Sequence, residues 1–282
     1  MPETQATSLP DLLYHYTTPA GLLGILESKS IWATNHRYLN DIREYSLALD
    51  RALAELEKLR EPVVFGSAYF LDQWQQYIEG VKELDTFVTS FSKNGDLLSQ
   101  WRAYSGSVPG YAIGFSSQIL KEIAESQGFD LAPCRYDEEK IRKILQNLLK
   151  EAWESAIEIQ KSGKTTFKGR EYDSHEGIAL DLGVRLSMVA PLVKHSSFIE
   201  EEEWRIFGRK YGKPIFVRIS RSGLIPYRQL DLSKASMFAI SEIIVGPGPD
   251  QDLAENALDF LLKSHQIPAS VTLSRIPFRA RR

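Results

Sequence analysis

The sequence has very little cysteine, no strong excess of charge and no long hydrophobic run. Cys134 is the only cysteine, which excludes an intrachain disulfide and a multi-cysteine zinc site. The 34 basic and 37 acidic side chains leave a net charge of −3, so no global cationic field attracts nucleic acid or anionic membrane. No apolar run reaches the ~20 residues that span a bilayer. We therefore expect a cytoplasmic protein that does not contact membranes, with a disordered tail over residues 1–11.

Standard catalytic signatures are also missing. The chain has no P-loop spacing, no GxGxxG after a strand, no GxSxG elbow and no HExxH. His15, His36, Asp41 and Glu44 could ligate a metal, but no spacing among them is diagnostic, and we expect none. Any site must therefore be sought in less familiar clusters.

The apolar and charged fractions, 43% and 25%, are those of a folded globular chain. Apolar spacing and turn residues predict an α+β fold with an antiparallel-leaning sheet. We expect a single domain over residues 12–282, with a helical insertion at 118–193 and a mobile loop at 161–173. Predicted helices cover residues 18–26, 41–60, 66–84, 96–104, 138–160, 176–193 and 252–262. Predicted strands cover residues 12–17, 31–34, 86–92, 111–115, 204–207, 215–219, 224–227, 240–245 and 270–276.

The first strand carries a histidine. Alternation places Leu13, His15 and Thr17 on one face and the two tyrosines, Tyr14 and Tyr16, on the other. An imidazole two residues from a hydroxyl can hold a polar ligand such as a ribose. A histidine that merely caps the next helix is the alternative.

Two further clusters combine carboxylates with other polar groups. Asp41 and Glu44 have the spacing of a helix capping box, which needs no ligand. The run of glutamates at 200–203 leads into a strand, where Trp204 and Ile206 should face the core and Glu203 and Arg205 the opposite side. An ionised carboxylate fixed in a cleft can stabilise an oxocarbenium centre. A solvated acidic turn is the alternative.

A last cluster is aromatic. Ser90 and Ser92 share a strand face, and Trp101 and Tyr104 lie three residues apart on the following helix. Two such rings can form a wall for a flat heterocycle, or they can simply belong to the core.

In this order, the clusters resemble a widespread bacterial family catalogued only as a domain of unknown function. The resemblance spans about residues 12–207. That family is distantly similar to ADP-ribosyltransferases, which implies a split, antiparallel-leaning sheet of ADP-ribosyltransferase-like type with a helical insertion. The motifs that carry the resemblance are LYHYT at 13–17, Trp32, LND at 39–41 with Glu44, Phe91-Ser92, Gln100-Trp101 with Tyr104, GYAIGF at 110–115, and Phe198 followed by EEEWR at 201–205.

The resemblance implies roles for individual residues. His15 would bind the nicotinamide-side ribose of NAD, Glu203 would stabilise the oxocarbenium ion and Glu201 would orient the acceptor. Trp32, Tyr38 and Trp101 are alternatives for stacking on nicotinamide. The other expected contacts to NAD are Tyr16, Thr17, Asn40, Ser92, Tyr104 and Arg205.

Three functional hypotheses follow. The first is an ADP-ribosyltransferase-like toxin or phage-defence effector that consumes NAD without a metal and modifies an unknown protein or nucleic acid, with a possible antitoxin or defence partner. The second is a non-catalytic module of the same fold that senses a nucleotide or a partner. The third is a nuclease or other hydrolase using His15, Asp41, Glu44 and Glu203, with or without a divalent ion.

Overall fold

A computed structural model describes residues 8–39, 42–59, 67–105, 109–167, 170–209, 214–220, 223–233 and 239–277, without the side chains of residues 42–44, 67–69 and 167. The chain divides into two compact units, and each is assembled from separate stretches of sequence. We call them the sheet unit, made of Met1–Asn35, Phe87–Pro133 and Phe198–Arg282, and the helical unit, made of His36–Thr86 and Cys134–Ser197.

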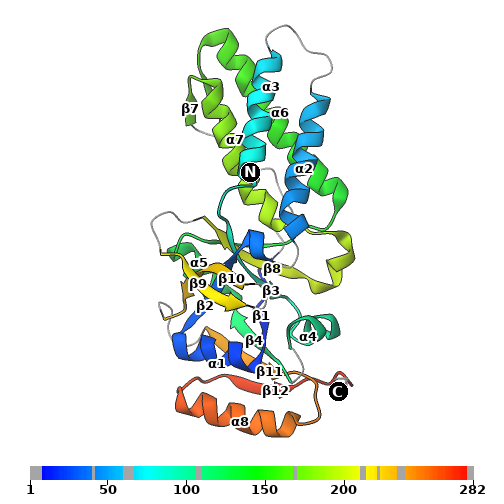
Figure 1. Cartoon of the computed structure of the whole chain (residues 1–282), viewed down its shortest axis with the longest axis vertical. Helices are drawn as coiled ribbons and strands as arrows, with labels where there is room; N and C mark the ends of the chain where they lie inside the picture. The colour runs from blue at the N-terminus through cyan, green and yellow to red at the C-terminus, as the bar shows by residue number, and fades with distance from the viewer. Residues whose placement is uncertain are drawn as a thin grey trace. The chain divides into compact units, whose positions relative to one another are not determined.

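The sheet unit contains a ten-stranded sheet (Figure 1). Its strands are β1 (Leu12–Thr17), β2 (Ser30–Asn35), β3 (Phe87–Ser92), β4 (Tyr111–Ser116), β5 (Asp130–Pro133), β8 (Glu203–Gly208), β9 (Phe216–Ser220), β10 (Gly223–Asp231), β11 (Ile240–Val245) and β12 (Ser270–Leu273). The main order is β12-β11-β4-β1-β3-β2-β10-β9, while β8 pairs with β3 and β5. Among the described strands only β11 and β12 pair in parallel, which confirms the antiparallel-leaning α+β fold.

The sheet is split along one edge of β3. The other edge of β3 pairs with β8 from Phe87 to Ser92. On the split edge, β1 meets β3 at Ser92, whereas β2 meets it at Val88 and Phe87. Strands β1 and β2 therefore diverge beside the middle of β3, near Ser90.

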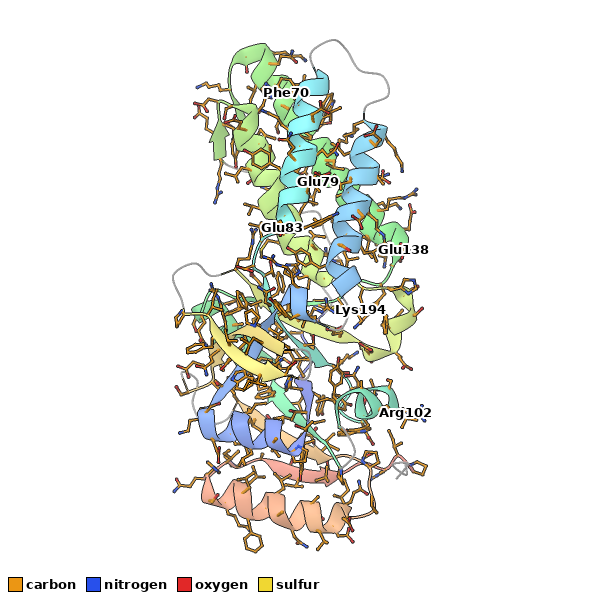
Figure 2. All side chains as sticks on the ribbon, viewed as in Figure 1. Phe70, Glu79, Glu83, Arg102, Glu138 and Lys194 are labelled. Carbon is orange, nitrogen blue, oxygen red and sulfur yellow. The ribbon has the colours of Figure 1, made fainter. Side chains whose placement is uncertain are left out.

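One face of this sheet packs into the main apolar core, which includes Leu13, Phe91, Phe115, Trp204 and Ile206. Helices α1 (Pro19–Ser28), α5 (Ser117–Ser126) and α8 (Gln251–Ser264) contribute leucines and isoleucines to this cluster. The Thr18 hydroxyl caps the start of α1, since it accepts a hydrogen bond from the Gly21 amide. Helix α4 (Leu98–Tyr104), which carries Arg102 (Figure 2), contributes Trp101 to a smaller separate cluster with Tyr16.

The helical unit contains α2 (Ile42–Lys58), α3 (Ser67–Val81), α6 (Glu138–Ser162) and α7 (His175–Val189), which lie side by side around one apolar cluster (Figure 1). Between α3 and α7, the rings of Phe70 and His175 stack with centroids 3.7 Å apart, and Figure 2 shows Phe70 and Glu79 along α3. Arg51 of α2 pairs with Glu138 at the start of α6. The described residues also form three short 3-10 helices: η1 (His36–Tyr38), η2 (Ala190–Leu192) and η3 (Ser196–Glu201).

Every predicted helix and strand is present in the structure, which also contains elements that were not predicted from the sequence. Residues 161–173 were expected to be a loop, yet β6 (Thr165–Phe167) and β7 (Arg170–Tyr172) form a short antiparallel hairpin there. Helix α5 and strand β5 were not predicted, and both belong to the sheet unit rather than to a helical insertion. Conversely, α2 and α3 join α6 and α7 in the helical unit. Helices that precede β3 in the sequence and helices that follow it therefore share one core.

Candidate functional site

The Glu203 carboxylate and the Arg205 guanidinium form a buried pair on β8. Arg205 Nε donates to Glu203 Oε1 at 2.7 Å, and Arg205 Nη2 donates to Oε2 at 3.2 Å. Across the ladder, Glu203 is opposite Ser92 and Arg205 is opposite Ser90, so these four side chains share one sheet face. Trp204 and Ile206 lie in the core on the other face, which confirms the alternation predicted from the sequence.

This pair fixes the position and charge of the carboxylate. Two parallel hydrogen bonds from one guanidinium give a carboxylate a defined plane, and each is stronger than a bond between neutral groups. Because both groups are buried, each charge has lost most of its water and is stabilised by the other. The geometry therefore supplies an oriented anion, already compensated by a neighbouring cation.

Glu201 approaches the same end of β3 through its backbone. Its carbonyl accepts a hydrogen bond of 2.8 Å from the Ser92 hydroxyl. Glu202, between Glu201 and Glu203, has a φ of 40°, a left-handed conformation that costs a non-glycine residue on the order of 1–3 kcal/mol. Its carbonyl accepts from the Lys93 amide at 3.2 Å. The acidic run is thus a strained turn tied to the end of β3, rather than a freely solvated segment.

His15 lies at the split in the sheet. Its Nδ1 is 3.0 Å from the Ser90 carbonyl oxygen, and its ring centroid is 5.6 Å from that of Phe91. Burial lowers the pKa of His15, more than its hydrogen bond to Ser90 raises it, so the neutral imidazole is favoured. A carbonyl can only accept, so Nδ1 carries the proton and Nε2 keeps a free lone pair. His15 can therefore accept a hydrogen bond from a ligand hydroxyl.

The structure brings β1, β3 and β8 together but separates His15 from Glu203 by sheet face. Tyr14, Ser92 and Glu203 occupy aligned positions on the three strands and share a face. His15 follows Tyr14, and its ring lies beside Phe91 on the core side, where it reaches the main chain of β3 through the split. A ligand that contacts both His15 and Glu203 would therefore have to reach both faces of the sheet.

Trp101 of α4 and Tyr16 of β1 pack against each other in a small apolar cluster. Their rings are T-shaped with centroids 4.7 Å apart, and Trp101 Nε1 donates to Asp96 at 2.7 Å. The Tyr16 hydroxyl donates to the Asn94 carbonyl and accepts from the Leu97 amide, both at 2.9 Å. Trp101 is only 1% exposed, whereas Tyr104 is 41% exposed. Trp101 and Tyr104 therefore do not form the aromatic surface that was predicted, and Trp101 has no exposed ring face for a ligand.

The remaining predicted residues are spread more widely. Thr17, partly buried on β1, has its hydroxyl against Gly21 of α1, where an added Cβ would lie 2.0 Å from it. Trp32 is exposed on β2, and Tyr38 is exposed on η1 of the helical unit. Asn40, Asp41 and the side chain of Glu44 lie outside the described residues. The described polar candidates that lie close together are therefore those on β1, β3 and β8.

Tyr14 was not singled out from the sequence, although it faces the Glu203 side. Its hydroxyl donates to Glu242 of β11, and burial together with this carboxylate raises the Tyr14 pKa. Glu242 is distant in sequence and sits in an ordinary strand, so only the pairing of β4 with β1 and β11 could reveal the contact.

The described ranges contain no cluster of side chains suited to a metal ion. No group of three or more His, Cys, Asp or Glu in them is arranged to hold one. The ring of His36, a candidate ligand, stacks on Tyr45 with centroids 3.8 Å apart, and its Nε2 is 3.0 Å from the Leu84 carbonyl oxygen. No helix among the described residues is both long enough and apolar enough to cross a membrane.

Residues 100–206 match the model of a family described as a protein of unknown function, DUF2971. This match confirms the resemblance to a domain-of-unknown-function family, whereas the individual motifs quoted for that resemblance stay predictions. Searches of the curated proteins and of the solved structures found no match. The more distant similarity to ADP-ribosyltransferases stays a prediction.

Proposed function

We propose that this chain is an ADP-ribosyltransferase-like enzyme that cleaves the nicotinamide–ribose bond of NAD and transfers ADP-ribose to an acceptor. The observation that carries the proposal is the adjacency of three strands at a split in the sheet. β1 brings His15, β3 brings Ser90 and Ser92, and β8 brings Glu203. A neutral imidazole with a free Nε2 and an oriented carboxylate are the groups that binding a ribose and stabilising a cationic sugar require.

In the proposed reaction, the bond between nicotinamide nitrogen and ribose C1 breaks, and its electron pair leaves with nicotinamide. The ribose is left with oxocarbenium character, which the Glu203 carboxylate stabilises. The acceptor nucleophile then adds to C1 and loses its proton. A preorganised electrostatic contact of this kind contributes roughly 3–4 kcal/mol to barrier lowering. His15 would accept a hydrogen bond from a ribose hydroxyl, and Arg205 would hold Glu203 in place.

The biological setting belongs to the same proposal. A chain that consumes NAD in the cytoplasm would act as a toxin or phage-defence effector, held in check by an antitoxin or a defence partner. The acceptor would be a protein or a nucleic acid. Glu201, whose main-chain carbonyl accepts a hydrogen bond from the Ser92 hydroxyl, would orient the acceptor.

The test is nicotinamide release from NAD by the purified full chain, with candidate protein and nucleic-acid acceptors supplied. Glu203→Gln keeps the shape of the side chain but removes its charge and replaces one of the two acceptor oxygens with an amide donor, and it should lower release by about 100-fold or more. Glu200→Gln is the matched control, because Glu200 lies in the same acidic run but is exposed. Equal release by wild type and Glu203→Gln, both with native melting curves, would refute the assigned role.

A second candidate function is a non-catalytic module that binds a nucleotide in the same split. The bidentate bond from Arg205 favours it, because a carboxylate whose two oxygens are both engaged has less charge to offer a cationic sugar. This reading predicts saturable NAD binding without nicotinamide release, and the same binding in Glu203→Gln.

A further inference from the structure

Three aromatic rings form a continuous row across β2, β10 and β9. Trp32 and Tyr227 have ring centroids 4.5 Å apart at an interplanar angle of 33°, and Tyr227 and Phe216 follow at 5.7 Å and 31°. The register places them together, since Tyr227 is opposite both Thr34 and Phe216, and Gln229 is opposite Trp32. Trp32 is 40% exposed and Phe216 is 38% exposed. The row therefore presents flat ring surface to the outside.

The same face carries an arginine. Arg218 Cζ lies 5.5 Å from the Trp32 ring centroid, and Arg218 Nη2 donates to the Thr34 hydroxyl at 3.1 Å. Its Nε is buried and makes no hydrogen bond to any described residue, and no described carboxylate pairs with the guanidinium. Burial lowers the pKa of Arg218, and it does so by more than the electrostatic interaction with Tyr227 raises it.

The opposite face of these strands is already occupied. Ile31, Ala33 and Leu230, which alternate with the residues of the row, belong to the main core. Core packing therefore accounts for one side of β2 and β10 but not for an exposed tryptophan beside a partly buried cation on the other. A side chain such as Arg218 is held in such a place at a cost that an anionic ligand would offset.

We propose that the surface formed by Trp32, Thr34, Phe216, Arg218 and Tyr227 binds a nucleoside phosphate. The base would stack on the Trp32 ring, and the phosphate would accept hydrogen bonds from the Arg218 guanidinium. A lone guanidinium suits one phosphate group, and the net charge of −3 does not favour a long nucleic acid. This site lies on β2, β9 and β10, requires no bond cleavage, and stands independently of the function proposed above.

Tryptophan fluorescence of the full chain during an ADP titration is the direct test. Of the five tryptophans, Trp74, Trp101 and Trp204 are buried and Trp153 is partly buried, so quenching by a stacked base should report Trp32. One stacked base and one charge-assisted pair correspond to a dissociation constant of roughly 1 mM or lower. Adenosine, which lacks the phosphate, should bind about 10-fold more weakly.

Two variants locate the site. Trp32→Leu and Arg218→Gln should each weaken ADP binding by about 10-fold or more, as followed by calorimetry. Arg142→Gln is the matched control, because Arg142 is an exposed helix arginine that already pairs with Glu139, and it should leave binding unchanged.

Two results would overturn the proposal: no saturable ADP binding up to several times the expected constant, or binding that both site variants retain. Self-association that Trp32→Leu abolishes, without any ADP binding, would instead assign the surface to a second copy of the chain. ADP carries no nicotinamide, so these outcomes do not depend on whether the chain cleaves NAD.

Discussion

Two arginines in the same sheet unit have opposite surroundings. Arg205 on β8 is buried against Glu203, which accepts two of its hydrogen bonds. Arg218 on β9 is partly buried against Trp32, with a threonine hydroxyl as its described hydrogen-bond partner and no described carboxylate. A buried cation is stable when its charge is compensated inside the protein, and otherwise it depends on something from outside.

The comparison separates two kinds of polar group. The Glu203–Arg205 pair is complete within the chain, so it contributes to the fold whether or not a ligand is present. Among the described residues no carboxylate compensates the charge of Arg218, and aromatic rings beside it are exposed. These features are best explained by a ligand that binds there. Substitutions in the Glu203–Arg205 pair should therefore change the free energy of unfolding, whereas substitutions around Arg218 should change ligand binding.

The largest expected effect comes from breaking the complete pair. Arg205→Met removes two charge-assisted hydrogen bonds from the buried Glu203 carboxylate and should lower the free energy of unfolding by about 3–5 kcal/mol. Urea unfolding followed by near-ultraviolet circular dichroism, which reports aromatic packing beside β8, measures it. A loss below about 1 kcal/mol, the usual value for an exposed pair, would contradict the buried pairing.

A smaller effect is expected at the split. His15→Gln removes an imidazole bonded to the Ser90 carbonyl and should lower the free energy of unfolding by about 1 kcal/mol at pH 8. The variant should also change the pH dependence. Because the pKa of folded His15 lies below 6.5, the unfolded chain binds a proton that the folded chain does not, and stability falls as pH drops below about 6.5.

Removing His15 should make that fall shallower. His36 and His175 have lowered pKa values for the same reason, burial, and stay in the variant, so part of the slope should remain. The measurement is urea unfolding of both proteins at several pH values above and below 6.5. An identical slope in wild type and His15→Gln would mean that the imidazole is not held neutral at the split.

The smallest expected effect is at the incomplete site. Arg218→Met removes a partly buried charge that no described carboxylate compensates, while its apolar stem still covers Trp32. The free energy of unfolding should change by less than about 0.5 kcal/mol. A loss comparable to that of Arg205→Met would show that Arg218 has a structural partner, and the contrast between the two arginines would disappear.

Local periodicity explains what the sequence could predict. Alternation along residues 203–206 assigned Glu203 and Arg205 to one face and Trp204 to the core, because a strand has a period of two wherever it lies. Helix α5 was missed although its buried residues Leu120, Ile123 and Ala124 recur at helical spacing, whereas the four residues of β5 are too few to establish a period. The 161–173 hairpin was missed because its polar residues resemble a loop.

Pairings between distant strands explain what it could not predict. The divergence of β1 and β2 beside Ser90 depends on how both strands pair with β3, which is distant from them in sequence. Residues 12–17 by themselves carry no pattern that predicts it. The Arg218–Trp32 contact likewise requires β10 to lie between β2 and β9. The position of His15 relative to Glu203 depends on register, because a shift of one residue would exchange the faces.

The most direct measurement of the central claim is nicotinamide production from NAD by wild type, Glu203→Gln and His15→Phe, assayed side by side with the Glu200→Gln control. The account predicts release by wild type and the control, and loss of it in both site variants while their melting curves remain cooperative. Release by all four proteins at one rate, or by none in the presence of every acceptor class, would contradict it.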